Sequence, residues 1–195
     1  MDERLESVVK KAVSRPEKRA WASVLAETYY QQYVGKADYF DDSIPDAGCS
    51  EDEEFFLPVK KRPSGIYDAF SAIVAAGAEI NASEDFSNAL TAAVGNLDYY
   101  MTEFLLSLGA EPRIWPSMDE PSEMTYGQNY YLDDLDIAFF DNRTANDYSS
   151  AAEEAILKTA RVLIEKGGLK NYSGYGLRVD EKGKLTAEKG RLVRF

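Results

Sequence analysis

Histidine is absent from the 195-residue sequence, and cysteine occurs only once, as Cys49. Without histidine the chain cannot carry a Ser-His-Asp triad, a Cys-His dyad or an imidazole general base. A single cysteine cannot close a disulfide within the chain or supply the thiolates of a zinc site. Long apolar runs are also missing, since the stretch 72–76 is far too short to cross a bilayer. These absences predict one protein domain with no membrane segment, located in the cytoplasm, where thiols stay reduced.

Basic residues are scarce as well: 22 Lys and Arg stand against 34 Asp and Glu, for a formal net charge of −12. The excess is concentrated in residues 63–155, which hold 17 acids and two bases, whereas residues 156–195 hold 4 acids and 10 bases. Affinity for a phosphate backbone comes from Lys and Arg, so this balance argues against nucleic-acid binding. Two interpretations stay open: the acids keep the protein soluble, or they steer a basic partner to one surface.

Apolar residues recur with the spacing of amphipathic helices along most of the chain. Patterns typical of capping boxes, Ser14 to Glu17 and Ser150 to Glu153, predict helix starts, and Gly167-Gly168 predicts a helix end. Beyond residue 172, apolar pieces at 177–179, 185 and 192–193 predict two or three short strands. The expected helices cover residues 3–14, 16–34, 65–76, 86–94, 98–108, 130–140 and 150–167.

A short motif repeats with a period of 32 residues. Gly77-Ala78-Glu79-Ile80-Asn81-Ala82 is followed by Gly109-Ala110-Glu111-Pro112, and a weaker copy occupies residues 165–171. Each copy follows an apolar triplet that closes an expected helix. A period of this length is typical of solenoids built from helix pairs.

The motif resembles the ankyrin repeat, whose second helix ends in leucines followed by Gly-Ala-Asp-Val-Asn-Ala. Residues 86–114 line up with one whole repeat without a gap. Where the family has Thr-Pro-Leu-His, this chain has Asn88-Ala89-Leu90-Thr91, and the family's glycine between the two helices is Leu97. In the family, the Thr and His side chains tie the turn and the neighbouring repeat together, and we expect Asn88 and Thr91 to do part of this.

The resemblance implies a mostly α fold, an ankyrin-like solenoid of helix pairs over residues 64–171. A third repeat over 130–171 is expected to carry about 13 inserted residues between its helices, most of them at 141–149. Residues 1–34 would form an N-terminal helical cap, and residues 172–195 a short hairpin-like tail. Between cap and solenoid lies an acidic segment, 35–63, which we expect to be a loop that is either functional or mobile.

Ankyrin-like proteins bind other proteins through their hairpin tips and first helices. The resemblance therefore implies a non-catalytic interaction module that needs no cofactor and no metal. Its partner would be another, basic protein, and the module would be an inhibitor or immunity-type protein if its carboxylates replace phosphates. Trp115 is expected to anchor the partner, unless it only packs the 111–129 loop. The partner-binding residues implied are Glu79, Asn81, Glu84, Asp85, Asn88, Glu111, Arg113, Trp115, Asp133 and Asp136.

Two other classes of function stay open. Asp133, Asp134 and Asp136 could hold a divalent metal and make the protein an enzyme. However, acids at the start of a helix are favoured by the macrodipole in any case. Self-association is the second alternative. A phosphate cradle at Gly174 and Gly176 is not expected, because the third glycine and the following helix are missing.

Overall fold

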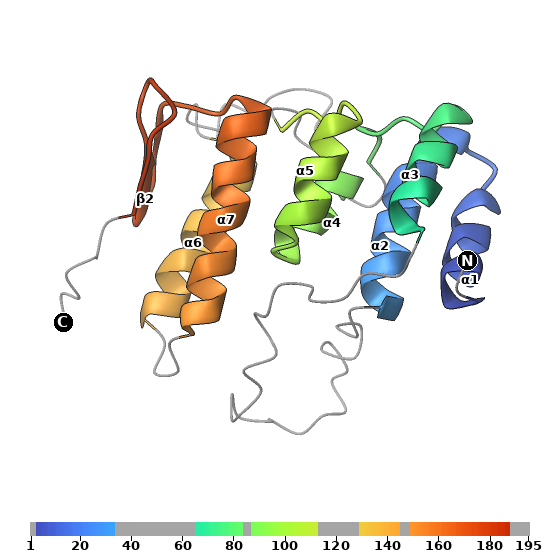
Figure 1. Ribbon diagram of the computed structural model, residues 1–195, viewed down its shortest axis with the longest axis horizontal. Coiled ribbons are helices and arrows are strands. Elements are labelled where there is room, and N and C mark those ends of the chain that lie inside the picture. Colours follow the sequence, from blue (N-terminus) through green and yellow to red (C-terminus); the bar gives the residue numbers. More distant parts are fainter. Residues whose placement is uncertain (1–2, 34–64, 84–86, 113–128, 145–148, 188–195) are drawn as a thin grey trace.

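The structure, a computed structural model, describes residues 3–33, 65–83, 87–112, 129–144 and 149–187. The expected acidic loop lies outside these ranges, as do four of the predicted partner-binding residues, Glu84, Asp85, Arg113 and Trp115. The described part contains seven α-helices and a small sheet of three strands, so the chain is mostly α, as predicted (Figure 1). The helices are α1 (Glu3–Val13), α2 (Trp21–Tyr33), α3 (Ile66–Ala75), α4 (Ala89–Gly95), α5 (Tyr99–Ser107), α6 (Tyr130–Thr144) and α7 (Ser150–Gly167).

The junction between the first two helices differs from the prediction. Ser14 does not cap a following helix, because its hydroxyl donates back to the Lys11 carbonyl at 2.7 Å and so completes α1. The chain then passes through a 3-10 turn, Lys18–Ala20, before α2 begins at Trp21. The expected capping box at Ser14 is therefore wrong. The junction is held instead by the Trp21 indole N–H, which donates to the Arg15 carbonyl at 3.0 Å.

The helices stand in two layers (Figure 1). One layer contains α2, α4 and α6, which contact one another in that order. The other contains α3, α5 and α7: α5 packs on α7, and the ring of Tyr67 in α3 lies 4.6 Å from that of Phe104 in α5, centroid to centroid. Between the two layers, α2 contacts α3, α4 contacts α5, and α6 contacts α7. The helices thus form pairs, and successive pairs stand side by side.

The third helix pair is longer than the one before it. α6 and α7 have 15 and 18 residues, against 7 and 9 in α4 and α5. The insertion expected at 141–149 is thus not mainly a loop, since α6 continues to Thr144 and residues 145–148 are outside the described part. α7 covers the expected residues 150–167, but its cap is one residue earlier than the expected capping box, because Ser149 rather than Ser150 accepts the cap bond, from the Ala152 N–H at 3.2 Å.

A small antiparallel sheet stands beside α6 and α7, at one end of the row of helices (Figure 1). Its strands are β1 (Tyr172–Ser173), β2 (Leu177–Val179) and β3 (Leu185–Ala187), in the order β1-β2-β3. β2 packs on α6 and β3 on α7. The prediction of two or three short strands is confirmed, although the first strand is at 172–173 and the expected piece at 192–193 lies outside the described residues.

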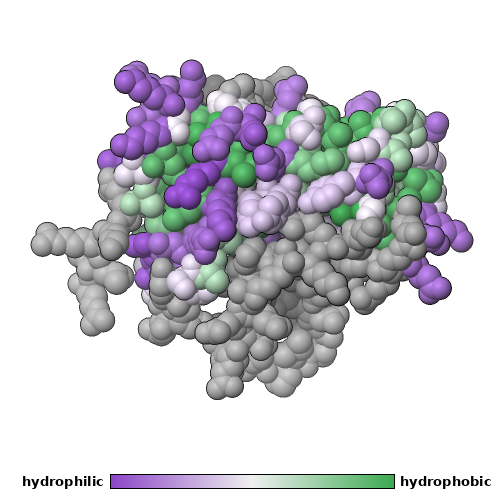
Figure 2. All heavy atoms as spheres, viewed as in Figure 1, coloured by the Kyte–Doolittle hydropathy of each residue, from purple (hydrophilic) through white to green (hydrophobic). Residues whose placement is uncertain are grey.

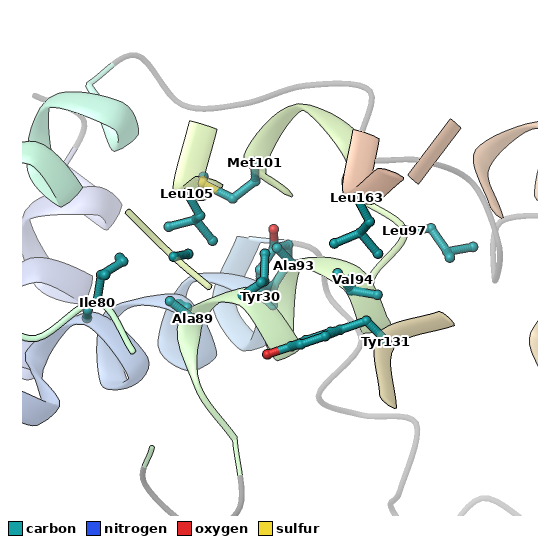
Figure 3. Packing of buried hydrophobic residues seen from close by; sticks show 14 of the residues in the cluster. Tyr30, Ile80, Ala89, Ala93, Val94, Leu97, Met101, Leu105, Tyr131 and Leu163 are labelled. Carbon is teal, nitrogen blue, oxygen red and sulfur yellow. The ribbon is translucent and has the colours of Figure 1, made fainter. Parts of the chain in front are cut away.

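One continuous apolar core runs between the layers (Figure 3). Leu90 in α4, Leu105 in α5 and Leu163 in α7 are each at most 1% exposed, as the helical spacing predicts. Burial of such side chains from every helix pair explains why neighbouring pairs stay together. No helix in the described ranges has both the length and the apolar character needed to cross a membrane.

Candidate functional site

The two copies of the repeated glycine have the same backbone conformation. Gly77 and Gly109 have φ of 104° and 95°, in the left-handed region that follows a helix end. In both copies the next residue donates its N–H across the turn: Ala78 to Ile73 and Ala110 to Leu105, each at 3.0 Å. The repeat in the sequence therefore corresponds to a repeated turn in the structure.

Leu97 also has a left-handed backbone conformation, with φ of 52°, although it is not a glycine. Asp98, the next residue, donates to Ala93 at 3.0 Å, as in the two glycine turns. The left-handed conformation costs a leucine about 1 kcal/mol or more. Burial of the Leu97 side chain, which is 6% exposed, offsets that cost.

Asn81 connects two successive tips. Its amide nitrogen donates to the Gly109 carbonyl at 3.3 Å, and its amide oxygen accepts from the Glu111 N–H at 2.9 Å. Asn81 was expected to contact a partner, but in the structure its side chain is committed to the protein's own backbone. Glu79 and Glu111, expected at the same two tips, have exposed side chains.

Asn88 is 1% exposed, so the expectation that it contacts a partner is wrong. Its oxygen accepts from the Thr91 N–H at 2.8 Å and from the Thr91 hydroxyl at 3.0 Å, which caps α4. Its nitrogen donates to the Tyr131 hydroxyl of α6 at 3.2 Å. Asn88 and Thr91 therefore hold the turn together, and Asn88 also connects it to the neighbouring helix pair. This is the role predicted for the residues that replace Thr-Pro-Leu-His.

Asp136 is also buried, at 1% exposure. It was expected to contact a partner, but its side chain is not accessible to one. Its two carboxylate oxygens accept from the N–H groups of Tyr175, Gly176 and Leu177 at 2.6, 2.8 and 2.6 Å. Tyr175 and Gly176 lie in the turn between β1 and β2, and Leu177 is the first residue of β2. The carboxylate thus binds the sheet to α6.

Two glycines make room for side chains of α6, Gly174 for the Asp136 carboxylate and Gly176 for the Phe139 ring. A Cβ on Gly174 would lie 2.3 Å from Asp136 Oδ2, and one on Gly176 would lie 2.7 Å from the Phe139 ring. A real Cβ essentially never comes this close to another heavy atom, so neither position accepts a side chain without movement. The Gly-x-Gly pair therefore surrounds an anion, as such loops do, but the anion is an internal aspartate.

Asp133 and Asp134 each have a tyrosine partner. The Tyr172 hydroxyl donates to Asp133, and the Tyr130 hydroxyl donates to Asp134. Partial burial raises the pKa of both carboxyl groups, and the hydrogen bonds from the tyrosines work against this shift. Burial, together with the nearby Asp134, raises the pKa of Tyr130 to about 12. Asp133, Asp134 and Asp136 therefore have three different surroundings.

Within the described ranges no three acidic or cysteine side chains are placed to hold a metal ion. Asp136, which the metal hypothesis requires, already accepts three hydrogen bonds. Comparison with known proteins adds no further guide, because no family model, curated protein or solved structure matches the chain.

Three exposed apolar residues were not predicted as candidate site residues: Ile137 and Phe140 on α6 and Tyr175 in the sheet turn. In the helix expected over 130–140, the apolar residues with helical spacing are Tyr131, Leu132, Leu135, Ala138 and Phe139, which leaves Ile137 and Phe140 on the outer side of the helix. That position was the available signal. Nothing in the sequence placed Tyr175 next to them.

Proposed function

We propose that this protein is a non-catalytic, ankyrin-like interaction module whose acidic middle binds a basic partner protein. The observation that carries the proposal is the charge of the central helix pairs. The described residues of 65–144 include nine acids and one base, Arg143. That base is already paired, since it contacts the Glu153 carboxylate at 2.6 Å. The described middle of the molecule therefore holds eight more acids than bases, although Glu103 is paired with Lys166 of α7 at 3.3 Å.

The two ends of the molecule differ from this middle. α7 and the sheet, over residues 150–187, carry seven bases and five acids, and residues 3–33 carry six bases and four acids. Over α7 hydrophilic side chains gather in Figure 2, and there acids and bases form pairs such as Lys158 with Glu154 at 2.7 Å. Solubility alone would not require such segregation. A field of one sign in the middle is the arrangement that steers an oppositely charged partner.

The ankyrin-like part of the proposal is supported by three features. The helix pairs stand side by side, the Gly77 and Gly109 turns have the same geometry, and Asn81 ties one tip to the next. In solenoids each repeat is stabilised mainly by its neighbours, which fits the Asn88–Tyr131 contact between pairs. Of the predicted partner-binding residues that the structure describes, Glu79 and Glu111 at the tips are exposed. We add Asp134 on α6 to them, because it is exposed too, although it was predicted only as a possible metal ligand.

The metalloenzyme alternative has less support. Asp136 is occupied by backbone donors, and Asp133 and Asp134 are hydrogen-bonded to separate tyrosines. These roles account for the carboxylates without a reaction. Within the proposal, an inhibitor or immunity-type role is the sharper version, because carboxylates on a rigid surface can occupy a site built for phosphates.

The test measures association with purified candidate partners, chosen from the products of neighbouring genes, at low and high ionic strength. The variant Glu79→Gln/Glu111→Gln/Asp134→Asn should slow association with the true partner, and high salt should remove that difference. The matched control, Glu165→Gln/Glu181→Gln, neutralises exposed acids in the mixed-charge part of the chain and should have little effect. A specific partner that is acidic, or whose association rate ignores both salt and the triple variant, would contradict the proposal.

A further inference from the structure

Large exposed apolar side chains gather at one place in the molecule. Of the five in the described part of the chain, three lie together: Ile137, Phe140 and Tyr175, with exposures of 52%, 48% and 80%. Ile137 and Phe140 are three residues apart on α6 and so share a face. The rings of Phe140 and Tyr175 have their centroids 6.0 Å apart. We call these three side chains the α6 patch. Single exposed apolar residues are ordinary on protein surfaces, but contiguous ones mark interaction sites.

The base of the α6 patch is rigid. Asp136 accepts the Tyr175 N–H at 2.6 Å, and Gly176 sits against the buried Phe139 ring. Both contacts fix the backbone that carries Tyr175 while its ring stays exposed. A surface that is already in place before binding loses little conformational entropy on binding.

On α6 itself, the residues around the α6 patch are mostly acidic. Asp133 and Asp134 lie one helical turn before Ile137, and Asp141 lies one turn after it. The base on this helix, Arg143, is directed to Glu153. An apolar centre with a rim of one charge complements a segment that has an apolar centre and a rim of the other charge.

We infer that the α6 patch is the docking surface for a segment of a basic partner protein that presents an apolar side chain flanked by Lys or Arg. This inference rests on the proposed function and deepens it by naming the partner's chemistry. Contact with Ile137, Phe140 and Tyr175 supplies affinity, because desolvated aromatic anchors dominate binding energy. The carboxylates supply orientation and a faster encounter.

The probe for the test is a labelled synthetic peptide of Leu and Lys, patterned as an amphipathic helix. A companion peptide keeps every Lys and replaces Leu by Ser. The wild-type protein should bind the Leu-containing peptide more tightly. Ile137→Ala/Phe140→Ala and, separately, Tyr175→Ala should each weaken that binding by about tenfold or more. Val13→Ala is the control, since Val13 is exposed on α1, at the other end of the molecule from the sheet (Figure 1). Circular dichroism and thermal melts check that the variants are folded.

The outcomes separate this inference from the proposed function. Equal binding of the two peptides, or unchanged peptide binding by both patch variants, overturns the inference about the α6 patch. If the variant Asp134→Asn/Asp141→Asn then still binds the peptides more weakly than the wild type, the proposed function stands. If neither peptide binds at low ionic strength, the proposed function fails as well. If the wild-type protein alone forms a dimer and the variant Ile137→Ala/Phe140→Ala does not, the patch binds a second copy of the chain. Tighter peptide binding after removal of residues 188–195 would assign it to the chain's own end. Both results overturn the inference.

Discussion

The carboxylate of Asp136 accepts a hydrogen bond from the Leu177 N–H at 2.6 Å, which joins α6 to the sheet across 41 positions of the sequence. Two further N–H groups of the same turn, those of Tyr175 and Gly176, point at this side chain. Buried carboxylates are stabilised by such charge-assisted bonds. The residue that looked most like a metal ligand or a partner contact is thus the attachment of the C-terminal sheet.

Replacing Asp136 by Asn should therefore destabilise the fold. An amide has one acceptor atom where the carboxylate has two, so its NH₂ would face the Tyr175 N–H, donor against donor. We expect a loss of about 2–3 kcal/mol in the free energy of unfolding, measured by chemical denaturation. Amide hydrogen exchange at Tyr175 to Leu177 should lose protection at the same time. Asp141→Asn, exposed on the same helix, should change stability by less than about 0.5 kcal/mol. Similar stabilities for the two variants would count against the attachment role.

Three glycine-to-alanine substitutions should have three different effects on stability. At Gly174 the new Cβ would overlap Asp136, so overpacking should cost about 2–3 kcal/mol. At Gly109 there is open space, but φ of 95° should cost about 1 kcal/mol. At Gly95, in α4, neither problem exists, and the higher helix propensity of alanine should gain about 0.5 kcal/mol. Thermal denaturation of the three variants checks the order, and a stable Gly174→Ala would argue against a filled turn.

Asn88 and Tyr131 should be energetically coupled. Asn88→Ala removes the α4 cap and the amide that pairs with the buried Tyr131 hydroxyl, which should cost about 2 kcal/mol. Tyr131→Phe should cost about 1 kcal/mol. The double variant should lose less than the sum by at least about 0.5 kcal/mol, as contacting residues do. A double-mutant cycle in urea measures this value, and strict additivity would mean that the contact does not link the two helix pairs energetically.

Tyr130 should make the fold sensitive to high pH. Burial first, and then the Asp134 carboxylate, raises the pKa of the Tyr130 hydroxyl to about 12 from an ordinary value of 10.0. Between these two values the unfolded chain has lost a proton that the folded protein still holds, so the free energy of unfolding falls as pH rises. Tyr130→Phe should lose stability less steeply over this range. In Asp134→Asn, tyrosinate absorbance should show a lower pKa for Tyr130, although burial keeps it above the ordinary value.

Several local features were readable from residue types alone. Gly77 and Gly109 follow apolar triplets at a fixed period, and both have the left-handed turn that glycine permits. The spacing of apolar residues located α3, α5 and α7 to within one or two residues, because an amphipathic helix must bury one face. At Ser14 the same kind of reasoning failed: its hydroxyl donates to the Lys11 carbonyl of the preceding helix, and a distant side chain, the Trp21 indole, holds the junction instead.

The candidate site was less predictable than the fold. Spacing put Asp133 and Asp136 on neighbouring positions of one helix, but it could not show that Asp136 points inward and Asp134 outward. Similarly, Ile137 and Phe140 could be placed outside the apolar stripe, whereas their neighbour Tyr175 comes from a turn far away in the sequence. A site formed across two elements needs the packing between them to be known.

The sequence by itself determined the helical composition, the repeated turns and the acidic middle, because these depend on local spacing and on residue charge. Only the tertiary structure decided what each carboxylate does. A side chain's charge is written in the sequence, but its burial and its partners depend on which turn packs against it. For Asp136 that turn is the one around Gly176, and once its three N–H groups are satisfied, the acidic groups left for a partner are those that remain exposed.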